Sequence, residues 1–109
     1  MTVWHKSLEN RFNTFAPAQQ ILMVCNELNR ADHSQGDPEE YTRCVERALE
    51  LIDLTIQNTR DKNDILELLR AREMMAQYYL DPPQQTRRLQ KVLVQMEPEA
   101  WRQIGESFE

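Results

Sequence analysis

The sequence predicts an all-α protein, built as an antiparallel up-down helical bundle with short amphipathic helices at its N- and C-terminal ends. Apolar side chains recur every three or four residues along most of the chain, which is the spacing of amphipathic helices. Prolines and capping residues bound the segments that carry this spacing. The chain contains only 2 glycines, so the glycine turns that close tight β-hairpins are nearly absent. Its 109 residues, 1–109, fit one compact domain.

The first two expected helices meet at Pro17. A short amphipathic helix is expected over residues 3–15 and a longer helix over 17–32. Pro17 restricts the residue before it away from helical conformations and fits the first turn of the next helix, so the chain breaks there. Gly36 follows the second helix and is a residue that can take a positive φ there. The apolar positions that define these helices are Trp4, Leu8, Phe12 and Phe15, then Ile21, Leu22, Cys25 and Leu28.

The segment Asp37–Glu40 marks the start of a helix expected over 38–58. Asp37 fits the N-cap position, and the proline after it fits the first helical position. Glu40 is placed to complete a capping box. A helix is therefore expected to begin directly after Asp37.

Three further helices complete the expected bundle. One is expected over 64–80 with Asn63 or Asp64 as its cap, and another over 84–96. The last is a short amphipathic helix over 98–108. Short connections between such helices favour antiparallel neighbours. The boundaries between them are marked by Asp81, Pro82, Pro83 and Pro98.

The charge balance disfavours general nucleic-acid binding but leaves one basic group. The chain has 13 Lys and Arg residues against 18 Asp and Glu residues, a formal net charge of -5, which repels a phosphate backbone overall. Arg87, Arg88 and Lys91 nevertheless lie in a stretch without acidic residues. This basic group could contact phosphates, and its alternative role is a solvated face that balances nearby acids.

No segment has the composition of a membrane span or a secretion signal. No apolar run approaches the roughly 20 residues that a bilayer span needs. The first residues lack a basic region followed by an apolar one. We therefore expect a cytoplasmic protein with no membrane partner.

The cysteines and histidines do not show the spacing of a metal or catalytic site. Cys25 and Cys44 lie in expected helix cores, where we expect buried, reduced thiols that could touch across the hairpin. His5 and His33 have none of the zinc-ligand spacings. Ser34 is next to His33, but neighbours in sequence need not face one another. We expect no catalytic residue, no metal and no cofactor, and a protein that is not an enzyme.

The helical hairpin over about residues 23–54 resembles a single tetratricopeptide-type repeat. With Gly36 at the inter-helix glycine of that repeat, Leu28 and Ala48 fall on its leucine and its second-helix alanine. The pattern departs from the repeat at Tyr41, where a small residue is usual, and no second copy follows. The resemblance implies a helix-turn-helix pair and favours protein binding, and it carries no ligand residues.

The bundle outline is also similar to that of the HEPN domains, which mark their active site with an arginine followed four to six residues later by a histidine. Here Arg30 precedes His33 by only three residues, and no arginine in the chain has a histidine four to six residues after it. A nucleic-acid-associated helical protein, HEPN-like or one member of a two-protein regulatory pair, is therefore the alternative function. It would use the basic group.

Adjacent methionines and adjacent tyrosines indicate a partner surface on the helix expected over 64–80. The two members of each pair point to different faces of the helix, and one bundle core cannot easily cover both faces. Methionine and tyrosine are also enriched at protein interfaces. Core packing is the competing interpretation. The expected contact residues are Met75, Tyr78, Tyr79, Trp101 and Phe108. The sequence thus predicts a small non-enzymatic module that binds a protein partner or forms a homodimer.

Overall fold

The computed structural model describes residues 6–108 and confirms the all-α fold class. Its elements are α1 (Lys6–Phe12), α2 (Pro17–Asp32), α3 (Pro38–Gln57), α4 (Lys62–Leu80), α5 (Arg87–Met96), α6 (Pro98–Ile104) and the 3-10 helix η1 (Gly105–Phe108). Within residues 6–108, no helix is both long enough and apolar enough to cross a lipid bilayer.

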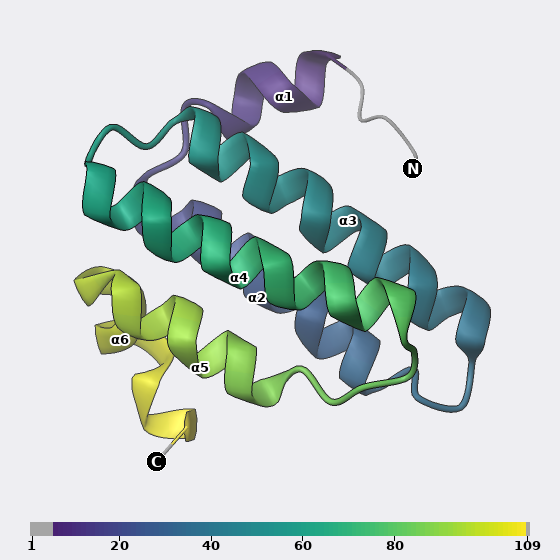
Figure 1. The fold of residues 1–109 in the computed structure, drawn as a ribbon. Coiled ribbons are helices and arrows are strands. Elements are labelled where there is room, and N and C mark those ends of the chain that lie inside the picture. Colours follow the sequence, from purple (N-terminus) through teal and green to yellow (C-terminus); the bar gives the residue numbers. More distant parts are fainter. Residues whose placement is uncertain (1–5, 109) are drawn as a thin grey trace.

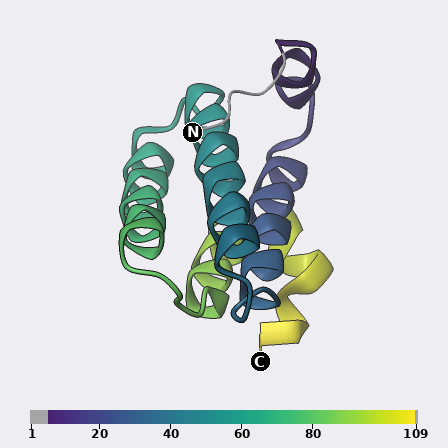
Figure 2. The ribbon, with the colours of Figure 1, turned by 90° about the vertical axis from the view of Figure 1, so that its right-hand side faces the viewer.

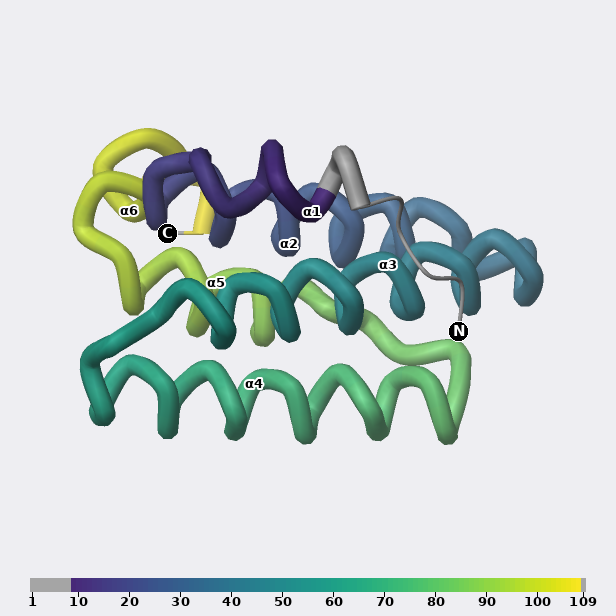
Figure 3. Tube along the Cα trace, turned by 90° about the horizontal axis from the view of Figure 1, so that it is seen from above, coloured from purple at the N-terminus to yellow at the C-terminus, as the bar shows by residue number. Residues whose placement is uncertain are grey.

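Helices α2 to α5 form an antiparallel up-down bundle (Figure 1). Each of them packs against the next, and α5 returns to pack against α2. Figure 2 shows α4 at one side of the bundle and α2 at the other, with α3 and α5 between them. From above, α4 runs along the edge opposite α1 (Figure 3). Helix α6 packs on α2 and α5, on the side away from α4.

Proline and capping residues set the boundaries of α2 and α3. Helix α2 has the predicted bounds, and α3 ends one residue before the predicted end. At the start of α3, the Asp37 carboxylate accepts a hydrogen bond from the Glu40 amide at 3.2 Å. This is the predicted side-chain cap. Gly36 does not use its freedom to take a positive φ, and no other described residue has a positive φ.

Helix α4 begins two residues before the predicted start because a different residue caps it. The Asp61 carboxylate accepts hydrogen bonds from the amides of Asn63 and Asp64 at 2.9 and 3.1 Å. Asn63 and Asp64, the predicted caps, therefore lie inside the first turn. Capping by Asp61 satisfies amide groups that have no carbonyl partner within the helix.

Helix α5 begins three residues after the predicted start because the preceding linker is held by other helices. The Gln84 amide donates to the Tyr41 hydroxyl at 3.0 Å, and the Thr86 amide donates to the Asp32 carboxylate at 2.6 Å. The Thr86 hydroxyl also donates to the Leu28 carbonyl at 2.7 Å. These bonds to α2 and α3 keep residues 82–86 out of the helix.

Both terminal helices end earlier than predicted. The helix predicted over 3–15 is α1, which ends at Phe12, and residues 3–5 with the predicted position Trp4 lie outside the described residues. The helix predicted over 98–108 divides at Gly105 into α6 and η1. A Cβ atom at Gly105 would lie 2.6 Å from the Trp101 ring, so this close approach requires glycine.

The hydrophobic core lies between the four main helices, and α4 contributes only one narrow face to it. The buried residues of α4 are Leu68, Ala71, Met75 and Tyr78. Large side chains that are fully buried elsewhere in the core include Phe12, Leu28, Tyr41, Ile52, Leu89 and Leu93. Because α4 stands at the edge of the bundle, most of its circumference faces outward (Figure 2).

Candidate functional site

The outer side of α4 carries an unusual concentration of exposed apolar side chains. Among the described residues, the exposed large hydrophobic side chains are Leu66 (54%), Leu69 (45%), Met74 (37%), Tyr79 (38%) and Leu80 (72%). All five belong to α4. Single exposed apolar residues are normal on a protein surface, whereas a contiguous group of them marks an interaction site.

Four of these five side chains fall in one stripe, which we call the α4 stripe. It consists of Ile65, Leu66, Leu69, Arg72, Glu73, Ala76, Tyr79 and Leu80. These residues recur at steps of three and four, so they share one side of the helix. Ile65, Arg72 and Ala76 are half-buried, and the other members are exposed. The stripe covers 15 residue steps, which at 1.5 Å per residue is about 22 Å.

Helix α3 holds two polar members of the α4 stripe in place. The Arg72 guanidinium donates from Nε to Oδ1 of Asp53 at 2.5 Å and from Nη2 to Oδ2 at 3.3 Å. The Tyr79 hydroxyl donates to Oε1 of Glu46 at 3.1 Å. These bonds raise the pKa of Arg72 and the pKa of Tyr79, because each favours the protonated group. Part of the stripe is thus held in place by bonds within the chain.

Glu73 differs from Arg72 and Tyr79 because it has no hydrogen-bond or ion-pair partner among residues 6–108. Its side chain is exposed, and it forms no ion pair with a described residue. An unpaired carboxylate in the middle of an apolar stripe can accept hydrogen bonds from a partner's arginine.

Two of the expected contact residues belong to the core instead of the surface. Met75 is fully buried and Tyr78 is 7% exposed. Both lie on the inner face of α4, so the prediction that they contact a partner was wrong. The physical reason is that α3 and α5 cover this face.

The other expected contact residues are separated in space. Tyr79 belongs to the α4 stripe, whereas Trp101 and Phe108 are half-buried on α6 and η1. Figure 2 places α6 across the bundle from α4. The structure therefore does not combine Tyr79, Trp101 and Phe108 into one surface.

Sequence reasoning did not assign Leu66, Leu69 and Leu80 to a surface. Their three- and four-residue spacing was visible in the sequence, but the same helix also carries the spacing of a buried face. Spacing alone does not say which of two apolar faces packs against neighbours.

The basic group is partly used inside the protein. The Arg87 guanidinium lies over the Phe108 ring, 4.7 Å from its centroid, and donates to the Ser107 carbonyl. Arg87 of α5 therefore holds η1 against α5 through these two contacts. Arg88 is exposed and Lys91 is half-buried.

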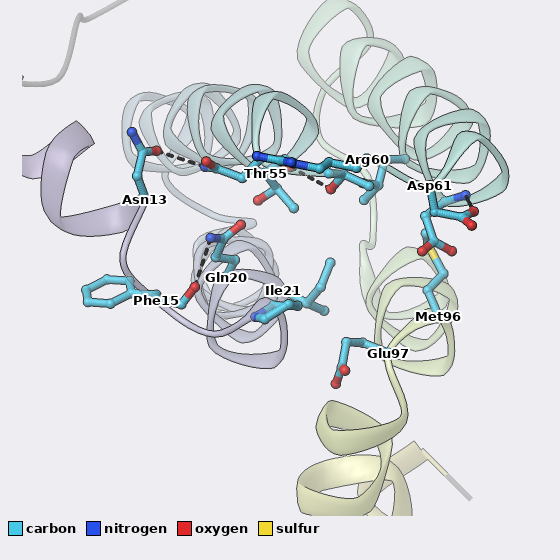
Figure 4. Close-up of a pocket in the computed structure, with 14 residues that line it drawn as sticks. Asn13, Phe15, Gln20, Ile21, Thr55, Arg60, Asp61, Met96 and Glu97 are labelled. Carbon is cyan, nitrogen blue, oxygen red and sulfur yellow. Dashed lines mark hydrogen bonds between the residues drawn. The ribbon is translucent and has the colours of Figure 1, made fainter.

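A cavity of about 530 Å³ lies at the end of the bundle where the α1–α2, α3–α4 and α5–α6 connections meet (Figure 4). Several of its polar groups already bond within the protein. Nε2 of Gln20 donates to the carbonyls of Phe12 and Phe15 at 3.2 and 3.1 Å. Asp61 caps α4, and Glu97 caps α6 through the Ala100 amide at 2.7 Å. Gln20 therefore joins α2 to the end of α1 and the connection after it, whereas Asp61 and Glu97 each cap the helix that follows.

The two thiols are buried in different surroundings. The Cys25 thiol donates to the Gln90 carbonyl at 3.7 Å, and the Cys44 thiol donates to the Glu40 carboxylate at 3.5 Å. Burial raises the pKa of Cys25 to about 12 and, together with Glu40, the pKa of Cys44 to about 11. Both are therefore protonated near neutral pH, which disfavours nucleophilic chemistry.

The histidine that can be described has a local partner. Nδ1 of His33 lies 2.8 Å from the Asn29 carbonyl, one turn earlier at the end of α2. Across residues 6–108, no three His, Cys, Asp or Glu side chains gather into a group that could hold a metal ion.

No family model, curated protein or solved structure matches the chain. The predicted helical hairpin is present as α2 and α3. The resemblances to a tetratricopeptide-type repeat and to the HEPN domains stay predictions from the sequence.

Proposed function

We propose that this protein is a small interaction module that binds another protein chain through the α4 stripe. The observation that carries this proposal is that all five exposed large hydrophobic side chains of the described residues lie on α4. Burying apolar area is the main favourable term in most protein association. A surface that places several such side chains on one helix gains this free energy at one contact.

The shape of the stripe suits a partner helix. Leu66, Leu69, Glu73, Ala76 and Leu80 follow the alternating three- and four-residue steps with which two helices pack along a common seam. The stripe is about 22 Å long and narrow, as expected for helix-to-helix recognition. The absence of enzymatic activity and the cytoplasmic location stay predictions from the sequence.

Photo-crosslinking in cells that make the full chain tests the proposal. A photoreactive amino acid placed at Leu69 is expected to give a crosslinked product of defined mass, whereas the same group at Arg88 gives none. The double substitution Leu66→Lys with Leu80→Lys should abolish the product. Met74→Lys is the matched control, because Met74 is exposed on α4 but lies outside the stripe, and it should leave the product unchanged.

Three outcomes would overturn the proposal. They are no product from Leu69, equal products from Leu69 and Arg88, and a product from Leu69 that survives the double substitution. Binding through position 88 alone would favour the basic group and, with it, a nucleic-acid or acidic partner.

A further inference from the structure

We infer that the cavity at the end of the bundle binds a small organic cation, a protonated amine carried on an apolar group. The volume of the cavity is about 530 Å³, which falls within the range of roughly 300–1,000 Å³ that small-molecule sites occupy. Its lining shares no residue with the α4 stripe. The inference therefore does not rest on the proposed function.

Apolar side chains from four parts of the chain line the cavity. They are Phe15 of the α1–α2 connection, Pro17 and Ile21 of α2, Leu68 of α4 and Met96 of α5. Ile21 and Leu68 are buried, whereas Phe15 and Met96 are half-buried. Walls of this kind remove the apolar part of a ligand from water, which is the main favourable term in such binding.

One buried side chain presents an unused hydrogen-bond acceptor to the cavity. Gln20 is 4% exposed, and its Nε2 donates to the carbonyls of Phe12 and Phe15. These two bonds fix which end of the amide is the nitrogen. Figure 4 shows the amide oxygen on the side towards Thr55, which also lines the cavity. No residue among 6–108 donates to this oxygen, so a ligand's ammonium group can donate to it.

The charged groups of the lining favour a cation over an anion. They are three carboxylates, Asp61, Asp64 and Glu97, and one guanidinium, that of Arg60. Asp61 and Glu97 each cap a helix with one oxygen, and their second oxygens accept no hydrogen bond within residues 6–108. Asp64 and Arg60 are exposed and form no ion pair with a described residue. The excess of negative charge attracts a cation and repels an anion.

An amide NMR titration of the full chain with phenethylamine tests the inference. This probe joins an ammonium group to an aromatic ring. We expect it to shift the amide signals of Gln20, Thr55 and Asp64, with a Kd of about 1 mM or below, as expected for a ligand of this size. Phenethyl alcohol is neutral and hydrocinnamate is an anion, and both carry a similar apolar group. Each should bind at least about threefold more weakly than phenethylamine, because neither forms the ion pair.

Two substitutions should change the affinity for phenethylamine in opposite directions. Asp64→Asn removes a carboxylate and should weaken binding about threefold, the size of one partly exposed ion pair. Arg60→Gln removes the opposing positive charge and should strengthen binding by a similar factor. Damage to the fold does not produce tighter binding, so the second variant is decisive even where the first disturbs the start of α4. Glu73→Gln is the matched control, because Glu73 is an exposed carboxylate of α4 outside the lining, and it should leave the affinity unchanged.

Four outcomes would overturn the organic-cation site. They are unshifted amide signals at the cavity, hydrocinnamate binding as tight as phenethylamine binding, an unchanged affinity in Asp64→Asn, and weaker binding in Arg60→Gln. None of these outcomes affects the proposed function, because the crosslink at Leu69 reports on the α4 stripe alone.

Discussion

Replacing Tyr41 with phenylalanine tests whether one buried hydroxyl joins α3 to the end of α4 and the linker that follows. The Tyr41 side chain is fully buried. Its hydroxyl donates to the Tyr78 carbonyl at 3.1 Å and accepts from the Gln84 amide at 3.0 Å. Tyr41→Phe keeps the ring and removes only these two bonds.

The expected cost follows from the number of bonds lost. A typical hydrogen bond contributes about 1 kcal/mol net, and a buried group left without a partner costs about 1–3 kcal/mol. With two bonds lost, the free energy of unfolding should fall by about 2 kcal/mol. For a protein of this size, with an m value of about 2 kcal/mol per molar urea, the midpoint should fall by about 1 M.

Urea unfolding followed by circular dichroism measures this change. Tyr79→Phe is the matched control, because it removes a hydroxyl from a neighbouring tyrosine whose partner, Glu46, is on the exposed surface. That variant should lose less than about 0.5 kcal/mol. If Tyr41→Phe and Tyr79→Phe unfold at the same urea concentration, the hydroxyl does not hold the linker as described.

Three further predictions concern the core, a thiol and a close packing contact. Met75→Ala should lower the free energy of unfolding by about 2–5 kcal/mol. Met74→Ala, on the exposed side of α4, should lower it by less than about 1 kcal/mol. Equal midpoints of urea unfolding for the two variants would contradict the burial of Met75. The raised pKa of Cys25, about 12 against 9.0 for a free thiol, means that the unfolded thiol ionises first. The contribution of Cys25 to the free energy of unfolding should therefore be constant below pH 9 and fall above it, so the loss of stability above pH 9 should be smaller in Cys25→Ala when both chains are measured by the same titration. Gly105→Ala should lower the free energy of unfolding by about 1–3 kcal/mol, because the added methyl group crowds the nearby indole. Gly36→Ala places no atom within 4 Å of the added Cβ and should change thermal unfolding little. A larger loss of stability in Gly36→Ala than in Gly105→Ala would refute the packing at Gly105.

Two of the helix starts that depend on neighbouring residues could be predicted from the sequence, whereas the start of α4 could not be placed exactly, because the chain offers several adjacent capping residues and Asp61 is the one used. Helices α2 and α3 begin where the sequence places them, because Pro17 and the Asp37 cap act within one turn of the residues they control. The boundary of α5 could not be predicted in this way. It depends on Asp32 and Tyr41, which lie far away in sequence and hold the linker through its backbone amides.

The candidate site could be predicted only in part. The sequence pointed to the helix that carries the α4 stripe, and to Tyr79, which is exposed in that stripe. It assigned Met75 and Tyr78 to that surface as well, although both lie in the core. A helix with apolar residues all round offers several faces, and the pattern does not rank them.

The sequence by itself determined the all-α class, the number and order of the main helices, and most of their ends. Helical spacing, prolines and caps act over a few residues, so these features depend only on residues that are close in sequence. Only the tertiary structure decided that α4 buries the face with Leu68 and Met75 and exposes the face with Leu66 and Leu69. Burial depends on which helices pack nearby, and α3 and α5 cover one side of α4 while its position at the bundle edge leaves the other side open.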